Sequence, residues 1–272
     1  MVLPDHVLVY PSHGAGSLCG KAMSDKNSST IGTEKALNWC LQKFTEEDFV
    51  KELLADQPFI PKYFSYDVEL NKKGAANFLQ SMAAVKVSEH IPDRLEGLII
   101  DTRNERLFKN GHFKNSVNLM DDTKFETWLG SIVAPHEEFY LIAESQQQLQ
   151  SLIARVLKIG YEPQIKNAFV AKELGGETIN RLNVDDFREN PDDFTIVDVR
   201  NFPETKEKVY FKNAINIPLY ELRERAAEIP TGKPVVVHCA GGYRSAAGTS
   251  IANEIIGNST EVFDLGEQIK NF

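Results

Sequence analysis

The sequence predicts an α/β protein with two tandem parallel-sheet domains, preceded by a smaller N-terminal segment. The first observation is an internal repeat: IIDTRN at 99–104 recurs as IVDVRN at 196–201, and FKNSVN at 113–118 recurs as FKNAIN at 211–216. The spacing of roughly a hundred residues is the size of a domain and exceeds that of a solenoid repeat. The second observation is that short apolar strands alternate with helical patterns in each copy, as in a parallel α/β sheet.

We divide the chain into residues 1–72, 73–178 and 179–272, and call the last two the first repeat and the second repeat. The N-terminal segment contains the strand pattern HVLVY, a Gly/Ser-rich turn, two helical patterns and the Pro-containing stretch PFIPKYF. This is too little for an obvious independent domain. The boundary to the first repeat is expected within KKGAANF at 72–78.

The elements of the second repeat follow in order from its sequence. Asn183 is placed to cap a short helix, and the strand FTIVDV follows. Next come the strand AINIP, the helix LYELRERAAEI, the strand PVVVH, a helix from about Ser245 and the strand TEVFDL. The run VVVH is apolar almost throughout, which indicates burial on both faces. Ligands of such sheets bind beyond the carboxyl ends of the strands, which is where Cys239 lies.

Composition excludes several classes of function. The net charge of -9 argues against a general nucleic-acid binder, because phosphate binding needs a basic surface. No apolar run approaches the ~18 residues of a membrane span, so no membrane partner is expected. The three cysteines, Cys19, Cys40 and Cys239, form neither a disulfide framework nor a zinc pattern. We therefore expect a cytoplasmic protein.

The stretch CAGGYRS at 239–245 is the candidate active site. Its small residues allow backbone N–H groups to turn toward Cys239, and the following helix adds its positive N-terminal end. Arg244 adds a permanent positive charge. All three effects favour a thiolate and would also stabilise a persulfide anion, Cys–S–S⁻.

A cysteine at a strand end is by itself most often a packing residue. Here the glycines together with Arg244 favour a nucleophile instead. The predicted catalytic residues are Cys239 and Arg244, and the predicted substrate-binding residues are Ala240, Gly241, Gly242, Tyr243 and Ser245.

CAGGYRS resembles the CxxGxRS active-site loop of rhodanese-type sulfurtransferases. VDVRNFPE at 197–204 and NAINIPL at 213–219 resemble the other two signatures of that family. The resemblance covers roughly residues 75 to 272 and implies two tandem rhodanese-like domains. It implies that Cys239 carries the sulfur and that Asp198 and Arg200 form a mainly structural ion pair. The second repeat departs from the family pattern in YFKNA and DLGEQ.

The first repeat keeps IIDTRNE and GHFKNSVN but has alanine, Ala143, at the position aligned with Cys239. The residues that follow, ESQQQL, include no arginine and no glycine. No thiolate can form there, so this repeat is expected to be catalytically inactive and retained for packing or docking. His112, in its GHF signature, is expected to be a structural or rim histidine rather than a catalytic one.

The N-terminal stretch YPSHGAGSLCG at 10–20 resembles a segment late in the metallo-β-lactamase fold of persulfide dioxygenases. The resemblance implies a dioxygenase fused to two rhodanese-like domains, the first of which lacks its cysteine. The upstream HxHxDH ligands of that fold are absent here, so residues 1–72 are expected to be the C-terminal remnant of such a domain. Iron is expected only together with the upstream part. His13 is the candidate metal ligand, but a metal site normally needs at least three, and we expect no cofactor.

The function predicted from these features is transfer of a sulfane sulfur through a Cys239 persulfide in sulfide and persulfide metabolism. The expected partners are small sulfur donors and acceptors: thiosulfate, glutathione persulfide and sulfite. Two alternatives remain open, a noncatalytic sulfide-sensing or scaffold module and a cysteine phosphatase. Only four residues separate Cys239 from Arg244, one fewer than the CxxxxxR loop of such phosphatases. Residues 1–72 are expected to pack against the first repeat, a second copy or a partner chain, thereby covering Leu8, Trp39 and Phe49.

Overall fold

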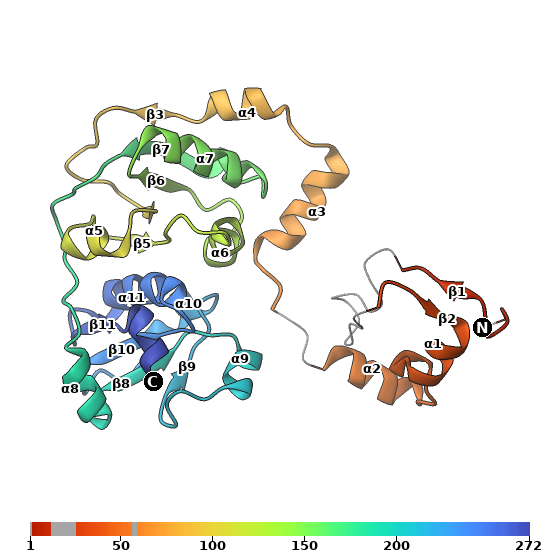
Figure 1. Cartoon of the computed structure of the whole chain (residues 1–272). Helices are drawn as coiled ribbons and strands as arrows, with labels where there is room; N and C mark the ends of the chain where they lie inside the picture. The colour runs from red at the N-terminus through yellow and green to blue at the C-terminus, as the bar shows by residue number, and fades with distance from the viewer. Residues whose placement is uncertain (1, 12–25, 56–58) are drawn as a thin grey trace. The chain divides into compact units, whose positions relative to one another are not determined.

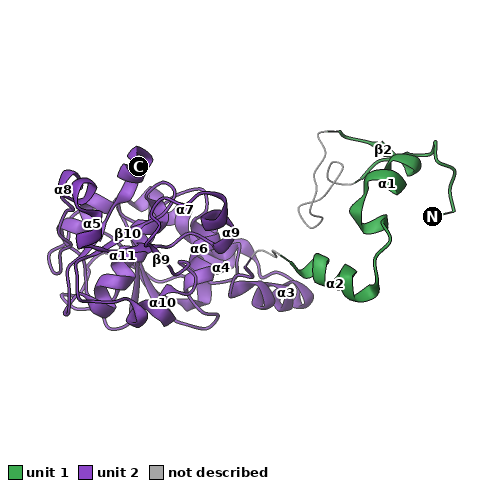
Figure 2. Ribbon diagram, turned by 90° about the horizontal axis from the view of Figure 1, so that it is seen from below, with its two compact units in different colours: residues 1–58 green, residues 59–272 purple. Residues whose placement is uncertain are grey.

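The computed structural model describes residues 2–11, 26–55 and 59–272. The chain forms two compact units, residues 1–58 and 59–272, which are coloured separately in Figure 2. The smaller unit holds a two-stranded antiparallel pair and short helices: β1 (Leu8–Val9), β2 (Ser29–Thr30), α1 (Ile31–Leu37), η1 (Trp39–Leu41) and α2 (Glu46–Leu54). Threonine side chains accept the first free N–H groups of α1 and α2, at 3.1 Å in each case.

Within the smaller unit, the aromatic side chains cover one another. The Trp39 and Phe49 rings stack with centroids 5.6 Å apart, and Phe44 meets Trp39 edge-on at 6.1 Å. Leu8 is 58% exposed. Two of the three apolar side chains for which we expected a covering surface therefore pack inside their own unit.

The larger unit begins earlier than the boundary expected at 72–78. Phe59 lies between two rings, with centroids 4.3 Å from Tyr220 and 5.8 Å from Trp128. The helix α3 (Tyr63–Lys73) follows, and the Tyr66 hydroxyl donates to the Gly160 carbonyl at 3.1 Å. Residues 59–73 thus belong to the same compact unit as the repeats.

The first repeat has a five-stranded parallel sheet in the order β3-β7-β6-β4-β5 (Figure 1). Its strands are β3 (Val87–Ser88), β4 (Leu98–Asp101), β5 (Ser116–Asn118), β6 (Phe139–Ala143) and β7 (Ile165–Val170). Its helical elements are α4 (Phe78–Ala84), α5 (Glu105–Asn110), α6 (Phe125–Ile132), α7 (Gln146–Leu157) and η2 (Glu162–Gln164).

The second repeat has a four-stranded parallel sheet in the order β11-β10-β8-β9. Its strands are β8 (Thr195–Asp198), β9 (Ile215–Asn216), β10 (Val235–His238) and β11 (Val262–Asp264). Its helices are α8 (Val184–Glu189), α9 (Phe202–Glu207), α10 (Leu222–Arg225) and α11 (Tyr243–Ile256), with short 3₁₀ turns η3 (Pro191–Asp193), η4 (Ala226–Glu228) and η5 (Gly266–Asn271). The predicted α/β class with parallel sheets is confirmed.

One predicted helix is much shorter than expected. LYELRERAAEI contains only the single α-helical turn of α10 followed by the 3₁₀ turn η4. Ile229 then takes an extended conformation, with φ -70° and ψ 124°, as favoured for a residue that precedes proline, here Pro230.

The two repeats share one hydrophobic core. A single cluster of buried residues includes Leu129 and Leu141 of the first repeat together with Val237 and Ile251 of the second. Polar contacts also join them: the Ser250 hydroxyl of α11 accepts the Asn118 N–H of β5 at 3.0 Å. In Figure 1, α11 lies between the two sheets. Folding of the second repeat therefore depends on surfaces supplied by the first.

Candidate active site

Cys239 lies at the carboxyl end of β10, between the neighbouring strands β8 and β11. Its side chain is buried, and its Sγ accepts the Gly242 N–H at 3.1 Å and the Gly241 N–H at 3.5 Å. The helix α11 begins directly after these glycines and has no side-chain N-cap hydrogen bond. Since Gly242 is the N-cap residue of α11 and donates its N–H to Sγ, the positive end of the helix lies close to the sulfur.

Gly242 determines the shape of this loop. Its φ of +102° lies in a region that residues with a Cβ rarely adopt, and a Cβ there would lie 3.0 Å from the Glu267 nitrogen. The Ser245 hydroxyl donates to the Gly242 carbonyl at 3.0 Å and fixes the turn from inside. The loop from Cys239 to Ser245 therefore has its predicted strand-to-helix geometry.

The positive charge of Arg244 is paired with a carboxylate. Its two terminal nitrogens donate to the two carboxylate oxygens of Glu204 in α9, at 2.6 and 2.7 Å. The Trp128 ring of the first repeat lies against the same guanidinium, 5.7 Å from its central carbon. Burial opposes both charges, yet the mutual hydrogen bonds raise the pKa of Arg244 and lower the pKa of Glu204. Both groups are therefore charged at neutral pH.

Asp198 and Arg200 form a buried ion pair beneath the loop. The Arg200 Nε lies 3.0 Å from both carboxylate oxygens, and one terminal nitrogen lies 2.6 Å from Oδ2. That terminal nitrogen also donates to the Lys208 carbonyl at 2.8 Å. The contacts join the end of β8 to the segment after α9. This geometry is consistent with the mainly structural role that we predicted for the pair.

His238 is a site residue that the sequence analysis did not single out. It is fully buried at the end of β10, with the Tyr210 and Phe211 rings packed edge-on against it at 5.7 and 5.2 Å. Its Nε2 lies 3.7 Å from Asp198 Oδ2. Burial lowers the pKa of His238, despite the nearby carboxylate, and favours the neutral imidazole.

The substrate-binding candidates surround Cys239 mainly through their backbone. Ala240 is exposed, whereas Gly242 and Ser245 are buried. The Tyr243 ring packs against the core that the repeats share, and burial strongly raises the pKa of its hydroxyl. Within the described part of the chain, that hydroxyl has no hydrogen-bond partner. The Tyr243 side chain thus contributes to the contact between the repeats.

In the corresponding loop of the first repeat, side chains of the loop accept hydrogen bonds from its backbone N–H groups. Ala143 is buried at the end of β6, and the next N–H group, that of Glu144, donates to Gln148 Oε1 at 2.7 Å. The Ser145 hydroxyl caps α7 by accepting the Gln148 N–H at 3.2 Å. The Glu144 carboxylate accepts the Asn104 N–H at 2.6 Å. The Glu144 and Gln148 N–H groups of this loop are therefore already hydrogen-bonded to its own side chains.

The first repeat nevertheless preserves the supporting ion pair. Arg103 binds Asp101 through Nε at 2.9 Å and through a terminal nitrogen at 2.6 Å, both side chains being fully buried. His112 stacks on Phe108 with ring centroids 4.0 Å apart, and its Nδ1 lies 2.9 Å from the Phe108 carbonyl oxygen. Burial lowers the pKa of His112. These contacts fit the structural role expected of this histidine.

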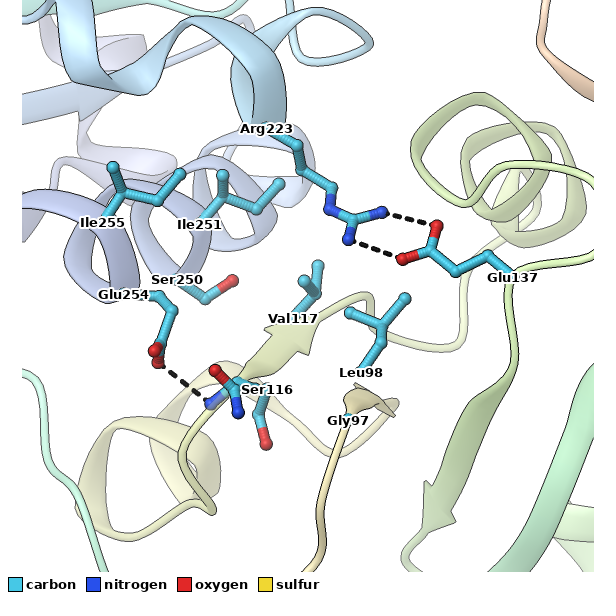
Figure 3. Close-up of a pocket in the computed structure, with 11 residues that line it drawn as sticks. Gly97, Leu98, Ser116, Val117, Glu137, Arg223, Ser250, Ile251, Glu254 and Ile255 are labelled. Carbon is cyan, nitrogen blue, oxygen red and sulfur yellow. Dashed lines mark hydrogen bonds and ion pairs between the residues drawn. The ribbon is translucent and has the colours of Figure 1, made fainter.

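A cavity of about 410 Å³ lies between the repeats, away from the Cys239 loop (Figure 3). Apolar side chains of β4, β5 and α11 line it, and the ion pair between Arg223 and Glu137, with N–O distances of 2.7 and 2.8 Å, crosses its edge. None of the predicted site residues lines this cavity.

The candidate metal ligand His13 and the nearby Cys19 lie outside the described residues. Among residues 2–11, 26–55 and 59–272, no group of three His, Cys, Asp or Glu side chains is placed to hold a metal ion. In the same residues, no helix is long and apolar enough to cross a membrane.

The fold and this loop define the class of protein. The model of the rhodanese-like domain matches the chain twice, over residues 83–169 and 183–271, so the chain belongs to the rhodanese-like family. Both matches fall inside the repeats that we delimited as 73–178 and 179–272. No curated protein matches the chain.

Several solved structures are similar to parts of the chain. A metallo-β-lactamase from Staphylococcus aureus subsp. aureus COL is 26% identical, with 62% of this chain and 47% of that chain covered and a TM-score of 0.43. A rhodanese-related protein from Thermoplasma volcanium is 35% identical, with 31% and 81% covered and a TM-score of 0.27. A NAD-dependent persulfide reductase from A. fulgidus is 33% identical, with 35% and 16% covered and a TM-score of 0.28. The chain thus spans about half the length of the S. aureus protein.

Proposed function

We propose that this protein is a sulfurtransferase that carries a sulfane sulfur on Cys239. The observation that supports this most directly is the position of Sγ, which accepts the N–H groups of Gly241 and Gly242 at the uncapped start of α11. The same arrangement can hold the terminal sulfur anion of a persulfide, because backbone N–H groups and a helix N-terminus both favour negative charge. Membership of the rhodanese-like family, whose members act on small sulfur substrates, supports the same reaction class.

In the first half-reaction the Cys239 thiolate attacks the outer sulfur of the donor. A bond forms between Sγ and that sulfur, the donor S–S bond breaks, and its electron pair leaves with sulfite when the donor is thiosulfate. In the second half-reaction an acceptor such as sulfite attacks the terminal sulfur of Cys239–S–S⁻ and restores the thiolate. Both steps are substitutions at sulfur with no net oxidation, so we propose that transfer needs no cofactor.

The physiological setting that we propose is sulfide and persulfide metabolism in the cytoplasm, where a free thiolate persists. Thiosulfate, glutathione persulfide and sulfite are the proposed small-molecule partners. The resemblance of residues 10–20 to the metallo-β-lactamase fold supports a link to persulfide oxidation, with iron belonging to that fold's upstream ligands rather than to the repeats.

The test is sulfur uptake measured by intact mass. Incubation with thiosulfate should add one sulfur atom, cyanide should remove it, and Cys239→Ser should abolish the adduct. Cys40, an exposed thiol of the smaller unit, gives the matched control, because Cys40→Ser should leave the adduct unchanged. An adduct that persists in Cys239→Ser would overturn the proposal.

Sulfur transfer to cyanide, assayed beside hydrolysis of an aryl phosphate, separates the alternatives. A scaffold or sensing module would take up no sulfur that is then transferred to cyanide. A cysteine phosphatase would instead hydrolyse an aryl phosphate, a reaction that we expect to be absent because the loop is one residue too short.

A further inference from the structure

The ion pair between Arg244 and Glu204 has a consequence for the sulfur donor. Glu204 is fixed by three donors: two nitrogens of Arg244 at 2.6 and 2.7 Å and the Asn201 N–H at 3.1 Å. Its side chain is 36% exposed, against 14% for Arg244. The negative member of the pair is therefore the one that meets solvent at this loop.

Two other positive charges near the loop are also paired with carboxylates. Arg200 is paired with Asp198 at 2.6 Å. Lys109, which reaches the second repeat from α5, is paired with Asp264 and Glu105 at 2.8 Å each. The Trp128 ring covers a further side of Arg244 without adding a charge. Near Cys239, the attraction for an anion therefore comes mainly from the N–H groups of the loop.

Two classes of sulfur donor differ sharply in the charge that they bring to this site. Thiosulfate arrives as a dianion, and attack by Cys–S⁻ gives Cys–S–S⁻ and sulfite dianion, so three negative charges share the site. A neutral organic persulfide, R–S–SH, gives Cys–S–SH and R–S⁻, and only one negative charge is present. In each case the donor S–S bond breaks, and its electron pair leaves with sulfite or with R–S⁻. Because Coulomb repulsion scales with the product of the charges, a carboxylate at the rim repels a thiosulfate dianion but not a neutral persulfide.

We propose that Glu204 is a specificity-determining residue that favours organic persulfides over thiosulfate as donors. This inference rests on the proposed sulfurtransferase function and identifies the donor class of the same site. Glu204 acts by offsetting the charge of Arg244 and by presenting its own charge on the more exposed side of the pair.

The test compares two donors, thiosulfate and the persulfide of mercaptoethanol, whose organic group is uncharged. The rate at which the peptide containing Cys239 gains one sulfur is followed by quenched-flow mass spectrometry. Glu204→Gln removes the charge and nearly keeps the size, so it should raise the ratio of the thiosulfate rate to the persulfide rate by about tenfold. Glu207→Gln is the matched control, because it removes the same charge from an exposed position of the same helix and should leave the ratio within about twofold.

A second measurement needs no substitution and applies even if the Glu204 variant fails to fold. Added salt screens exposed charges, so the wild-type ratio of thiosulfate to persulfide loading should rise with ionic strength. A ratio that does not rise with salt, or that Glu204→Gln leaves within about twofold of wild type, would overturn this inference while leaving the proposed function intact. If wild-type Cys239 gains sulfur from neither donor, the proposed function fails and this inference fails with it.

Discussion

Two adjacent glycines donate to the same sulfur but face different steric limits. Both Gly241 and Gly242 donate an N–H to Cys239 Sγ. A Cβ at Gly241 would meet nothing within 4 Å, whereas at Gly242 it would meet the Glu267 backbone at 3.0 Å with φ at +102°. The glycine requirement is therefore concentrated at one of the two positions.

We predict that Gly242→Ala lowers the free energy of unfolding by about 1–3 kcal/mol, the usual range for a strained backbone conformation. Gly241→Ala should change it by less than about 0.5 kcal/mol, as an unstrained surface substitution does. Urea denaturation followed by circular dichroism measures both. Equal losses in the two variants would show that φ and the Glu267 contact do not limit position 242.

The buried histidines lead to a pH prediction. Burial lowers the pKa of both His112 and His238 in the folded state. Below the unfolded-state pKa of about 6.5, the unfolded chain binds protons that the folded chain does not, so stability falls as pH decreases. The stabilisation is present above that pH and is lost progressively beneath it.

Urea denaturation at a series of pH values from about 7 to 5 should therefore show a declining free energy of unfolding. Replacing either histidine, as in His112→Gln or His238→Gln, should make the decline less steep. His90→Gln, at an exposed position, is the control and should keep the wild-type slope. If both buried-site variants also keep the wild-type slope, these histidines are not the groups that take up the protons.

At the level of single residues, the sequence identified the loop but not its environment. Cys239, the two glycines and Arg244 are contiguous and could be found from local pattern alone. Glu204 lies 40 positions from its partner, and Trp128 comes from the other repeat. His238 looked like the end of an apolar strand. Such contacts depend on tertiary packing, which no local spacing encodes.

Among the elements, the two equivalent strand-to-helix loops differ in what their N–H groups bind. The Gly241 and Gly242 N–H groups of the second-repeat loop donate to Sγ, whereas in the first-repeat loop the Gln148 and Ser145 side chains accept the N–H groups of Glu144 and Gln148. The supporting ion pairs are alike, with a shortest distance of 2.6 Å in each repeat. Since the loops differ in more than the cysteine, introducing a cysteine alone into the first repeat should not create a sulfur-binding site.

We predict that Ala143→Cys in a Cys239→Ser background takes up no sulfur from thiosulfate. The introduced thiol would be buried, the residues after it include neither an arginine nor a glycine, and the adjacent Glu144 N–H is already hydrogen-bonded. Intact mass with and without cyanide is the measurement. One removable sulfur on the peptide that carries the introduced thiol would mean that the loop of the first repeat can still form a cradle.

The elements themselves were largely predictable because the apolar strands and the repeat carry a strong periodic signal. The prediction failed where packing outweighed local pattern. The helix predicted at 219–229 has only four α-helical residues, Leu222–Arg225, and the aromatic side chains Phe59, Tyr63 and Tyr66 attach 59–73 to the larger unit. Local sequence shows that these rings are apolar but not which surface receives them.

At the scale of the larger unit, the shared core predicts that the repeats unfold together. Leu141 of β6 is fully buried in the cluster that also contains Val237 and Ile251 of the second repeat. Leu141→Ala should lower the free energy of unfolding by about 2–5 kcal/mol.

Hydrogen exchange should then show a loss of protection in β10 and α11 of the second repeat as well as in the first. Leu79→Ala, at a position that is 75% exposed, serves as the control and should leave both repeats protected. Protection that falls only in the first repeat would show that the repeats unfold separately.

The shared core also bears on how such a chain can evolve. A duplicated domain that lacks its nucleophile is no longer under selection for its own catalytic activity. If such a domain folded on its own, it could accumulate substitutions without effect on the rest of the protein. Here the first repeat, which has Ala143 in place of the cysteine, supplies one side of the interior in which the second repeat folds, and its Trp128 lies against Arg244. Selection on the function of the second repeat therefore also acts on the first repeat, through folding. The interior of the first repeat should tolerate few substitutions, whereas its loop after β6 should tolerate more.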